Sequence, residues 1–317
     1  MVDAEWAALT ETQQQRWSAV LRCLSEVVPA GATVVVGGVG AEVFAERLAA
    51  VTSAADVLVG GSADVEAGGA GLLAAADVVV RLRGGPPGAD RAEDADIVVD
   101  LRDPAWPVIR RVADRLSTSD RWHLTESRAF FAAKASTWDR RFGDDLPAYA
   151  VAVAEAGFRP GGLLVDVGCG TGRALPSLRS AVGPDGVVVG LDLTPEMLAE
   201  ARARSVTEHA SLVLADACRL PFADASADGV FAAGLLMHLP DPDAGLRELA
   251  RITRPGGRLV LFHSTGRAAL AARHGRSLRP DEPLAEAPLR ASTADTGWRL
   301  DRYEDAAERF LAVATRT

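Results

Sequence analysis

The chain has 317 residues, of which 48% are hydrophobic, and its formal net charge at pH 7 is −9. This length allows two domains or one large one, and the apolar content is typical of a globular protein. The acidic balance argues against a general nucleic-acid binder, because neutralising phosphates requires a basic face, and no apolar run reaches the roughly 18 residues of a membrane span.

The first third of the chain predicts a small α/β domain. Residues 11–28 place Trp17, Leu21 and Leu24 on one face of an amphipathic helix. A buried strand at 33–36 runs into three glycines and then into a helix over 41–49. The sequence also predicts short strands at 56–59, 77–80 and 96–99, and a last helix over 106–116.

The strand, glycine turn and helix of residues 34–49, with the segment 95–104, resemble the uridine-kinase-like branch of P-loop proteins. The Walker motif has Gly-Lys-Ser/Thr where this chain has Gly40-Ala41-Glu42. The lysine that holds the phosphates and the hydroxyl that holds Mg²⁺ are therefore missing from the motif. We expect a degenerate, non-catalytic P-loop-like domain that serves as a scaffold, for homodimer contacts or as a wall of a neighbouring site.

A short polar segment at 117–120 is the predicted junction between two domains, 1–117 and 118–317. From Arg121 onward the composition changes to an aromatic-bearing helix. Strands and helices then alternate regularly, as in a doubly wound α/β sheet.

The stretch 163–172 joins an apolar strand to a glycine turn and a helix. Glycines occupy positions 168, 170 and 172, and backbone without side chains can approach a nucleotide-like ligand closely. The dinucleotide fingerprint requires another glycine three places after its second one, where this chain has Arg173. The stretch is therefore a poor match to the NAD pattern.

Asp166, Gly168, Gly170 and Gly172 resemble motif I of the class I S-adenosylmethionine (SAM)-dependent methyltransferases. The resemblance extends over most of residues 122–317, and it implies a Rossmann-like seven-stranded domain with SAM as cofactor. It includes a motif IV-like segment at 228–241, a Pro-Gly-Gly turn into the strand ending at residue 263, and a final antiparallel pair at 298–301 and 309–314.

The same resemblance implies how the ligand is held. Asp166 lies near the amino-acid part of SAM, Asp192 accepts hydrogen bonds from the ribose hydroxyls, and Asp216 accepts from the adenine amino group. The Ala217 amide donates to the adenine ring. The expected cofactor contacts are, in full, Asp166, Gly168, Cys169, Gly170, Gly172, Asp192, Leu193, Asp216, Ala217 and Ala233.

The acceptor side is less defined by the sequence. His238 and His263 follow two neighbouring strands, and either could act as a general base for a hydroxyl or ammonium acceptor. Phe131 and Trp138, seven positions apart, share a helix face in a segment that resembles the helix covering SAM in this family. They either form core or line this lid, where they would contact the acceptor. Arg267 belongs to a loop that would border the acceptor pocket. No cluster of carboxylates suggests a metal site.

The sequence thus predicts methyl transfer from SAM to a small molecule, with in-line displacement in a dry pocket. Two alternatives remain open: a SAM-binding regulatory or scaffolding protein, and a bifunctional enzyme whose front domain phosphorylates a nucleoside-like substrate. The amino terminus lacks a basic signal segment and the three cysteines are scattered, which predicts a cytoplasmic protein without membrane partners.

Overall fold

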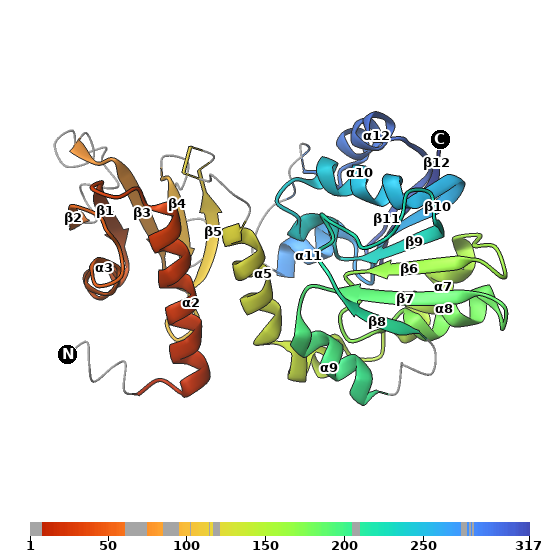
Figure 1. Ribbon diagram of the computed structural model, residues 1–317, viewed down its shortest axis with the longest axis horizontal. Helices are drawn as coiled ribbons and strands as arrows, with labels where there is room; N and C mark the ends of the chain where they lie inside the picture. The colour runs from red at the N-terminus through yellow and green to blue at the C-terminus, as the bar shows by residue number, and fades with distance from the viewer. Residues whose placement is uncertain are drawn as a thin grey trace. The chain divides into compact units, whose positions relative to one another are not determined.

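The computed structural model describes residues 8–60, 75–84, 95–101, 103–113, 115–116, 121–204, 210–273, 278, 280 and 282–317. The chain divides into two compact units, Met1–Phe130 and Phe131–Thr317 (Figure 1). The predicted junction at 117–120 lies outside the described residues, so the boundary at 117/118 stays a prediction.

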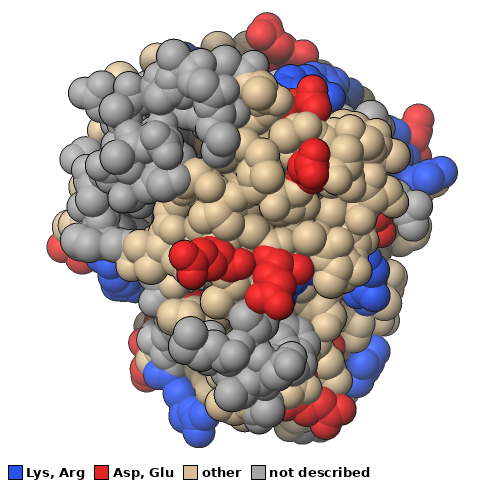
Figure 2. All heavy atoms as spheres, turned by 90° about the vertical axis from the view of Figure 1, so that its left-hand side faces the viewer, with Lys and Arg blue, Asp and Glu red and all other residues tan. Residues whose placement is uncertain are grey.

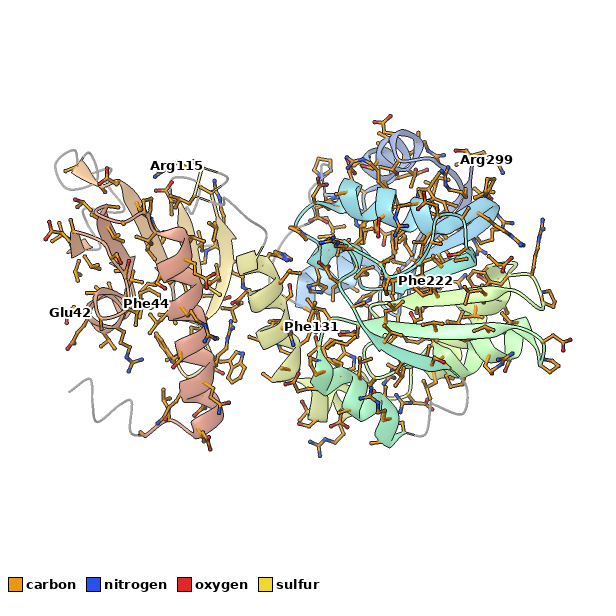
Figure 3. The ribbon with its side chains drawn as sticks, viewed as in Figure 1. Glu42, Phe44, Arg115, Phe131, Phe222 and Arg299 are labelled. Atoms are coloured by element: carbon orange, nitrogen blue, oxygen red, sulfur yellow. The ribbon has the colours of Figure 1, made fainter. Side chains whose placement is uncertain are left out.

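The first unit is built on a five-stranded sheet with the order β2-β1-β3-β4-β5. Its pairs are parallel except β4 with β5, which run antiparallel. Phe44 on the second helix is fully buried, while Glu42 on the first turn of that helix is exposed (Figure 3). The elements are α2 (Glu11–Val27), β1 (Thr33–Gly38), α3 (Ala41–Ala49), β2 (Asp56–Gly60), β3 (Val78–Arg83), β4 (Ile97–Asp100) and β5 (Val108–Val112).

The predicted helix over 106–116 is wrong, because Val108–Val112 forms strand β5. Val108, Ile109 and Val112 are buried, and Arg110 and Arg111 between them are exposed. Branched side chains at these positions favour a pleated, half-buried strand, and β4 offers an antiparallel partner for it. The pairing with β4 therefore determines that this segment forms a strand, although the spacing of its apolar residues also suits a helix.

Helix α5 (Arg121–Ala132) is fixed to the first unit by a buried ion pair between Arg16 on α2 and Glu126. Glu126 also accepts a hydrogen bond of 2.9 Å from the Ile109 amide on β5. These contacts account for the assignment of this helix, as far as Phe130, to the first unit.

The second unit contains a seven-stranded sheet with the order β11-β12-β10-β9-β6-β7-β8. Strands β10, β9, β6, β7 and β8 are parallel, and β12 runs antiparallel to both of its neighbours. The predicted Rossmann-like, seven-stranded fold is confirmed. The strands are β6 (Leu163–Val167), β7 (Val187–Asp192), β8 (Ser211–Leu214), β9 (Ala227–Ala233), β10 (Thr253–His263), β11 (Trp298–Asp305) and β12 (Phe310–Arg316).

Helices flank this sheet, and two apolar clusters of side chains pack against it. None of the described helices is both long and apolar enough to cross a lipid bilayer. The helices are η2 (Ala135–Thr137), α6 (Trp138–Phe142), α7 (Leu146–Glu155), α8 (Leu175–Val182), α9 (Pro195–Ala203), η4 (Leu236–His238), α10 (Pro242–Ile252), α11 (Arg267–Arg273) and α12 (Glu286–Asp295).

Candidate functional site

The glycine turn after β6 sits at the carboxyl edge of the parallel strands, where open α/β sheets bind ligands. Gly168, Gly170 and Gly172 all have positive φ, at 74°, 54° and 79°, a region that favours glycine. The Gly168 and Cys169 amides both donate to the Leu191 carbonyl oxygen at 2.8 Å, so the turn is tied to β7. A Cβ on Gly170 would meet no heavy atom within 4 Å, which leaves this backbone open to a ligand.

Asp166 is a buried carboxylate directly before this turn. Asp166 is 2% exposed, and its Oδ1 atom has no hydrogen-bond partner. Burial, with a further contribution from the neighbouring Asp192 carboxylate, raises the pKa of Asp166 to about 8. A buried carboxylate with an unpaired oxygen is stabilised by a cationic partner, so this position suits a ligand with positive charge.

Asp192 ends β7 and accepts two backbone hydrogen bonds of 2.8 Å, from the amides of Gly170 and Thr194. Burial raises its pKa even though these N–H groups favour the charged form. The Thr194 hydroxyl, directly before α9, makes no capping hydrogen bond with this helix. The backbone bonds instead fix the Asp192 side chain against the glycine turn, with Leu193 beside it.

Asp216 and Ala217 follow β8 in a tight turn. The Cys218 amide donates to Asp216 Oδ1 at 2.9 Å, the geometry of a side chain that closes its own turn. Asp216 also forms an isolated bridge with Arg219. The turn is thus organised locally, at the end of the strand that follows β7 in the sheet.

Aromatic side chains gather where β9 ends. The Phe131 ring meets the His238 ring edge-on, with centroids 4.9 Å apart, and the Trp138 ring at 5.7 Å. Phe131 and Trp138 are half-buried and His238 is exposed, while Ala233 at the end of β9 is half-buried. The structure therefore brings together three of the residues that the sequence predicted for the acceptor side. The predicted shared helix face is wrong, however, because Phe131 lies on α5 and Trp138 begins the separate helix α6.

His263 ends β10, the strand beside β9. Its Nδ1 atom lies 2.9 Å from the Thr265 carbonyl oxygen and 3.0 Å from the Thr265 amide nitrogen. The ring also lies near the end of β9, because a Cβ on Gly234 would be 3.9 Å from His263 Cδ2. The backbone of Thr265 therefore orients the imidazole through one nitrogen.

Arg267, the predicted acceptor-pocket residue, forms ion pairs with acidic side chains of the same unit. Its guanidinium pairs with Glu282 at 2.9 Å and with Asp305 at 3.3 Å, and it donates to the Tyr303 hydroxyl at 3.3 Å. Its side chain is only 11% exposed. The charge of Arg267 is thus balanced within the chain.

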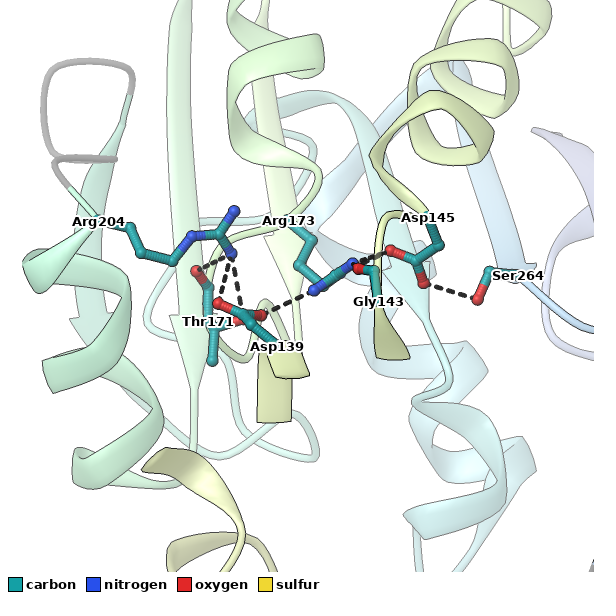
Figure 4. A network of polar contacts seen from close by, with 7 residues as sticks. All are labelled: Asp139, Gly143, Asp145, Thr171, Arg173, Arg204 and Ser264. Carbon is teal, nitrogen blue, oxygen red and sulfur yellow. Dashed lines mark hydrogen bonds and ion pairs between the residues drawn. The ribbon is translucent and has the colours of Figure 1, made fainter. Parts of the chain in front are cut away.

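A polar network beside the glycine turn was missed by the sequence reasoning (Figure 4). Arg173 donates to Asp139 at 2.8 Å, to Asp145 at 2.7 Å and to the Gly143 carbonyl oxygen at 2.7 Å. Asp139 also accepts from the Thr171 hydroxyl at 2.8 Å and pairs with Arg204 at 3.0 Å. Only Arg173 carried a signal in the sequence, as a departure from the dinucleotide fingerprint.

Within the described part of the chain, no group of three or more His, Cys, Asp and Glu side chains has an arrangement that could hold a metal ion. The polar groups that the structure brings to the carboxyl edge are instead carboxylates and backbone amides of the glycine turn. These groups suit an organic ligand that carries both hydroxyl and cationic groups.

Comparison with known proteins agrees with this fold. Residues 165–261 match the family described as "Methyltransferase domain". The chain is 39% identical over 107 residues to a 27-O-demethylrifamycin SV methyltransferase of Amycolatopsis mediterranei, covering 32% of this chain and 39% of that protein. It is 39% identical over 118 residues to a demethylmenaquinone methyltransferase of Desulfitobacterium hafniense, covering 35% of this chain and 45% of the relative.

The solved structures agree at the level of the fold. A SAM-dependent methyltransferase from Aquifex aeolicus superimposes with a TM-score of 0.50 at 22% identity, covering 59% of this chain and 98% of that structure. The chain spans less than half the length of the two curated relatives. The Phe131–Thr317 unit therefore has the class I methyltransferase fold, and residues 165–261 within it match a methyltransferase domain.

Proposed function

We propose that this chain transfers a methyl group from SAM to a small-molecule acceptor. The observation that carries the proposal is Asp166, a buried carboxylate with an unpaired oxygen, next to the open backbone of Gly170. SAM carries an ammonium and a sulfonium, so its positive charge suits the carboxylates of Asp166 and Asp192, where a pyrophosphate would be repelled. The names of the rifamycin and menaquinone relatives support a small-molecule acceptor.

In this proposal, each cofactor residue has a task that follows from its position. Asp166 pairs with the ligand ammonium, and the Gly168–Gly172 backbone, with Cys169, lies against the amino-acid part. Asp192 accepts from the ribose hydroxyls, because the amides of Gly170 and Thr194 hold its oxygens in place. The remaining proposed contacts are Leu193, Asp216 and Ala217 around the adenine, and Ala233 below the sulfur.

SAM supplies a methyl group on a positively charged sulfur, which is already activated for transfer. The protein then has to exclude water and hold the acceptor atom in line with the sulfur–methyl bond. We propose that Phe131 and Trp138 form the apolar wall for the acceptor. A hydroxyl or ammonium acceptor must also lose a proton as its bond to the methyl carbon forms, and His263 or His238 would take it.

Titration calorimetry with SAM and S-adenosylhomocysteine (SAH) tests this function directly. We expect micromolar or tighter binding of both ligands to the full chain. Absence of binding at this level would contradict the proposal. Tight binding with SAM left intact in the presence of demethylated quinone and polyketide acceptors would favour a regulatory SAM-binding protein instead.

For the first unit we propose a degenerate, non-catalytic P-loop-like domain. Gly40, at φ 79°, is the residue directly before α3, and no side chain caps this helix. The exposed Glu42 lies in the first turn of α3. The amino end of a helix attracts anions such as phosphate. The negative charge of the Glu42 carboxylate at the amino end of α3 would repel a phosphate there. We expect no ATP binding by calorimetry; binding would support the bifunctional alternative.

We also propose that the first unit mediates self-association. Leu58 and Val59 on β2 are 39% and 44% exposed, and β2 lies at the end of the strand order of its sheet. On the face drawn in Figure 2, neutral residues cover much of the described surface with several acidic side chains among them, so the proposed contact rests on the edge strand β2 and not on charge. Light scattering should show a dimer that Val59→Lys dissociates; a monomeric wild type would contradict this.

A further inference from the structure

Asp145 links the ends of two strands that are not neighbours in the sheet. Its Oδ1 accepts from Arg173 Nε at 2.7 Å, and its Oδ2 accepts from the Ser264 hydroxyl at 2.8 Å. Arg173 follows the glycine turn after β6, and Ser264 directly follows β10, while β9 lies between these two strands. The side chain of Asp145 thus connects the two strand ends across β9 (Figure 4).

Helix α7 holds Asp145 at this position. Asp145 is the residue before the helix, and Tyr149 lies one turn later. The centroid of the Tyr149 ring lies 4.9 Å from that of Phe262 on β10 and 6.2 Å from that of Phe231 on β9. The beginning of α7 is therefore anchored on the two strands that carry the proposed acceptor side. The polar link and the aromatic packing fix the same segment from two directions.

Arg173 fixes the other end of the link. Its side chain is 5% exposed and pairs with both Asp139 and Asp145, whose side chains are 36% and 14% exposed. The bidentate geometry of a guanidinium gives such pairs directional as well as electrostatic strength. Without Arg173, the carboxylates of Asp139 and Asp145 would lose their shared cation.

We infer that Asp145, held by Arg173, is a positioning residue that couples the cofactor side of the site to its acceptor side. The inference rests on the proposed function for the identity of the two sides. A ligand that orders the glycine turn fixes Arg173, Arg173 fixes Asp145, and Asp145 fixes Ser264. His263, one residue before Ser264, is then held more firmly when the cofactor side is ordered.

Hydrogen exchange with SAH as the probe tests the coupling. In the wild type, SAH should slow exchange both in residues 166–173 and in residues 263–266. Ser264→Ala removes only the last link, so it should keep SAH affinity within about twofold of wild type and lose the slowing at 263–266. Slowing confined to 166–173 in the wild type, or retained at 263–266 in the variant, would overturn the inference.

A second set of variants tests Arg173. Arg173→Met should weaken SAH binding by about tenfold or more. Arg173→Lys should weaken it less, because lysine keeps the positive charge but lacks the bidentate guanidinium group. Arg309→Met is the matched control, since Arg309 also bridges two carboxylates, Glu304 and Glu155, in the same unit. It should leave SAH affinity unchanged. Equal SAH affinity in Arg173→Met and wild type would overturn the inference.

The coupling also has a readout without any ligand, which separates it from the proposed function. In the ligand-free chain, Arg173→Met should speed exchange at 263–266 as well as at 139–145, and Arg309→Met should not. Failure of the wild type to bind SAH would contradict the function, whereas unchanged exchange at 263–266 would contradict the coupling. Should Arg173→Met fail to fold by circular dichroism, Arg173→Lys and Ser264→Ala decide the same question.

Discussion

Two strand–glycine turn–helix elements occur in this chain, and they differ in what lies in front of the glycines. In the first unit, a Cβ on Gly38 would lie 2.1 Å from the Leu82 carbonyl oxygen, so the chain's own backbone occupies that space. In the second unit, a Cβ on Gly170 would meet no heavy atom within 4 Å. At these two positions the glycine therefore has different physical reasons: close packing at Gly38 and access at Gly170.

The charges around the two turns differ as well. Asp166, which is buried, and Asp192, which is half-buried, place two carboxylates beside the second turn. The first turn leads into α3, whose first-turn acid, Glu42, is exposed. A glycine pattern identifies a turn, and the buried groups around it indicate which ligand the turn can accept. Variants of the two turns can test this difference directly.

The largest effect is expected from Gly38→Ala. The added Cβ would clash with the Leu82 carbonyl, and φ at Gly38 is 111°, a value that side chains rarely adopt. We expect the free energy of unfolding of the first unit to fall by about 3 kcal/mol or more, by urea denaturation. Gly31→Ala is the matched control, because Gly31 has φ 77° and no atom within 4 Å of its Cβ position. Equal losses in the two variants would contradict the packing argument.

Asp166→Asn should weaken SAH binding by about a hundredfold, because the amide keeps the shape of the side chain but cannot pair with the ligand ammonium. Calorimetry measures this change. The control is Asp100→Asn, since Asp100 is also a buried strand-end aspartate, 5% exposed, in the first unit. An Asp166→Asn variant that binds within about threefold of wild type would refute the proposed role of this carboxylate.

The pH dependence of stability should also depend on Asp166. Its pKa is raised to about 8 by burial and by Asp192, whereas an aspartate in an unfolded chain has a pKa of about 3.9. Between these values the folded state holds more protons, so the free energy of unfolding falls as pH rises, by at most about 1.4 kcal/mol per pH unit from this group.

Urea denaturation from pH 5 to pH 8 measures this slope. In Asp166→Asn the fall should be shallower than in wild type, and saturating SAH should reduce it in wild type because the ammonium stabilises the ionised carboxylate. Parallel curves for wild type and Asp166→Asn would show that the pKa of Asp166 is not raised in the folded state.

The smallest effect is expected from Gly170→Ala. The methyl group enters open space, so the free energy of unfolding should fall by only about 1 kcal/mol, from the positive φ. SAH binding should weaken by about tenfold because the methyl group occupies the ligand's approach to the backbone. Gly161→Ala, at φ 77° with no atom within 4 Å, is the control, and its SAH affinity should stay at the wild-type value. Unchanged affinity in Gly170→Ala would mean that the ligand does not approach this backbone.

Strands β6 and β7 of the second unit were predictable because they are short runs of Val and Leu that lead into glycine or aspartate. Leu163–Val167 and Val187–Asp192 form strands where their pattern indicates, and the residues after them lie at one edge of the sheet. The segment 106–116 was wrongly predicted as a helix, since its branched residues fit both a helical and a strand periodicity. Only the pairing with β4 distinguishes the two.

The polar network could not be predicted for a different reason. Asp145 and Ser264 are 119 positions apart, and neither lies in a recognisable motif. The position of Arg267 after β10 predicts a place at the acceptor pocket, which stays a prediction, whereas its pairing with Glu282 and Asp305 could not be read from the sequence. Sequence spacing assigns residues to strand ends, but only the folded chain shows which partners balance their charges.

Strand β12 lies between β10 and β11, although it is the last of the described strands along the chain. During synthesis, β10 and β11 emerge from the ribosome before the strand that joins them, so this half of the sheet cannot close until Phe310–Arg316 has left the exit tunnel. A nonsense mutation or proteolytic cut before Phe310 would leave two unpaired strand edges, and a truncated product of this kind would be prone to aggregate.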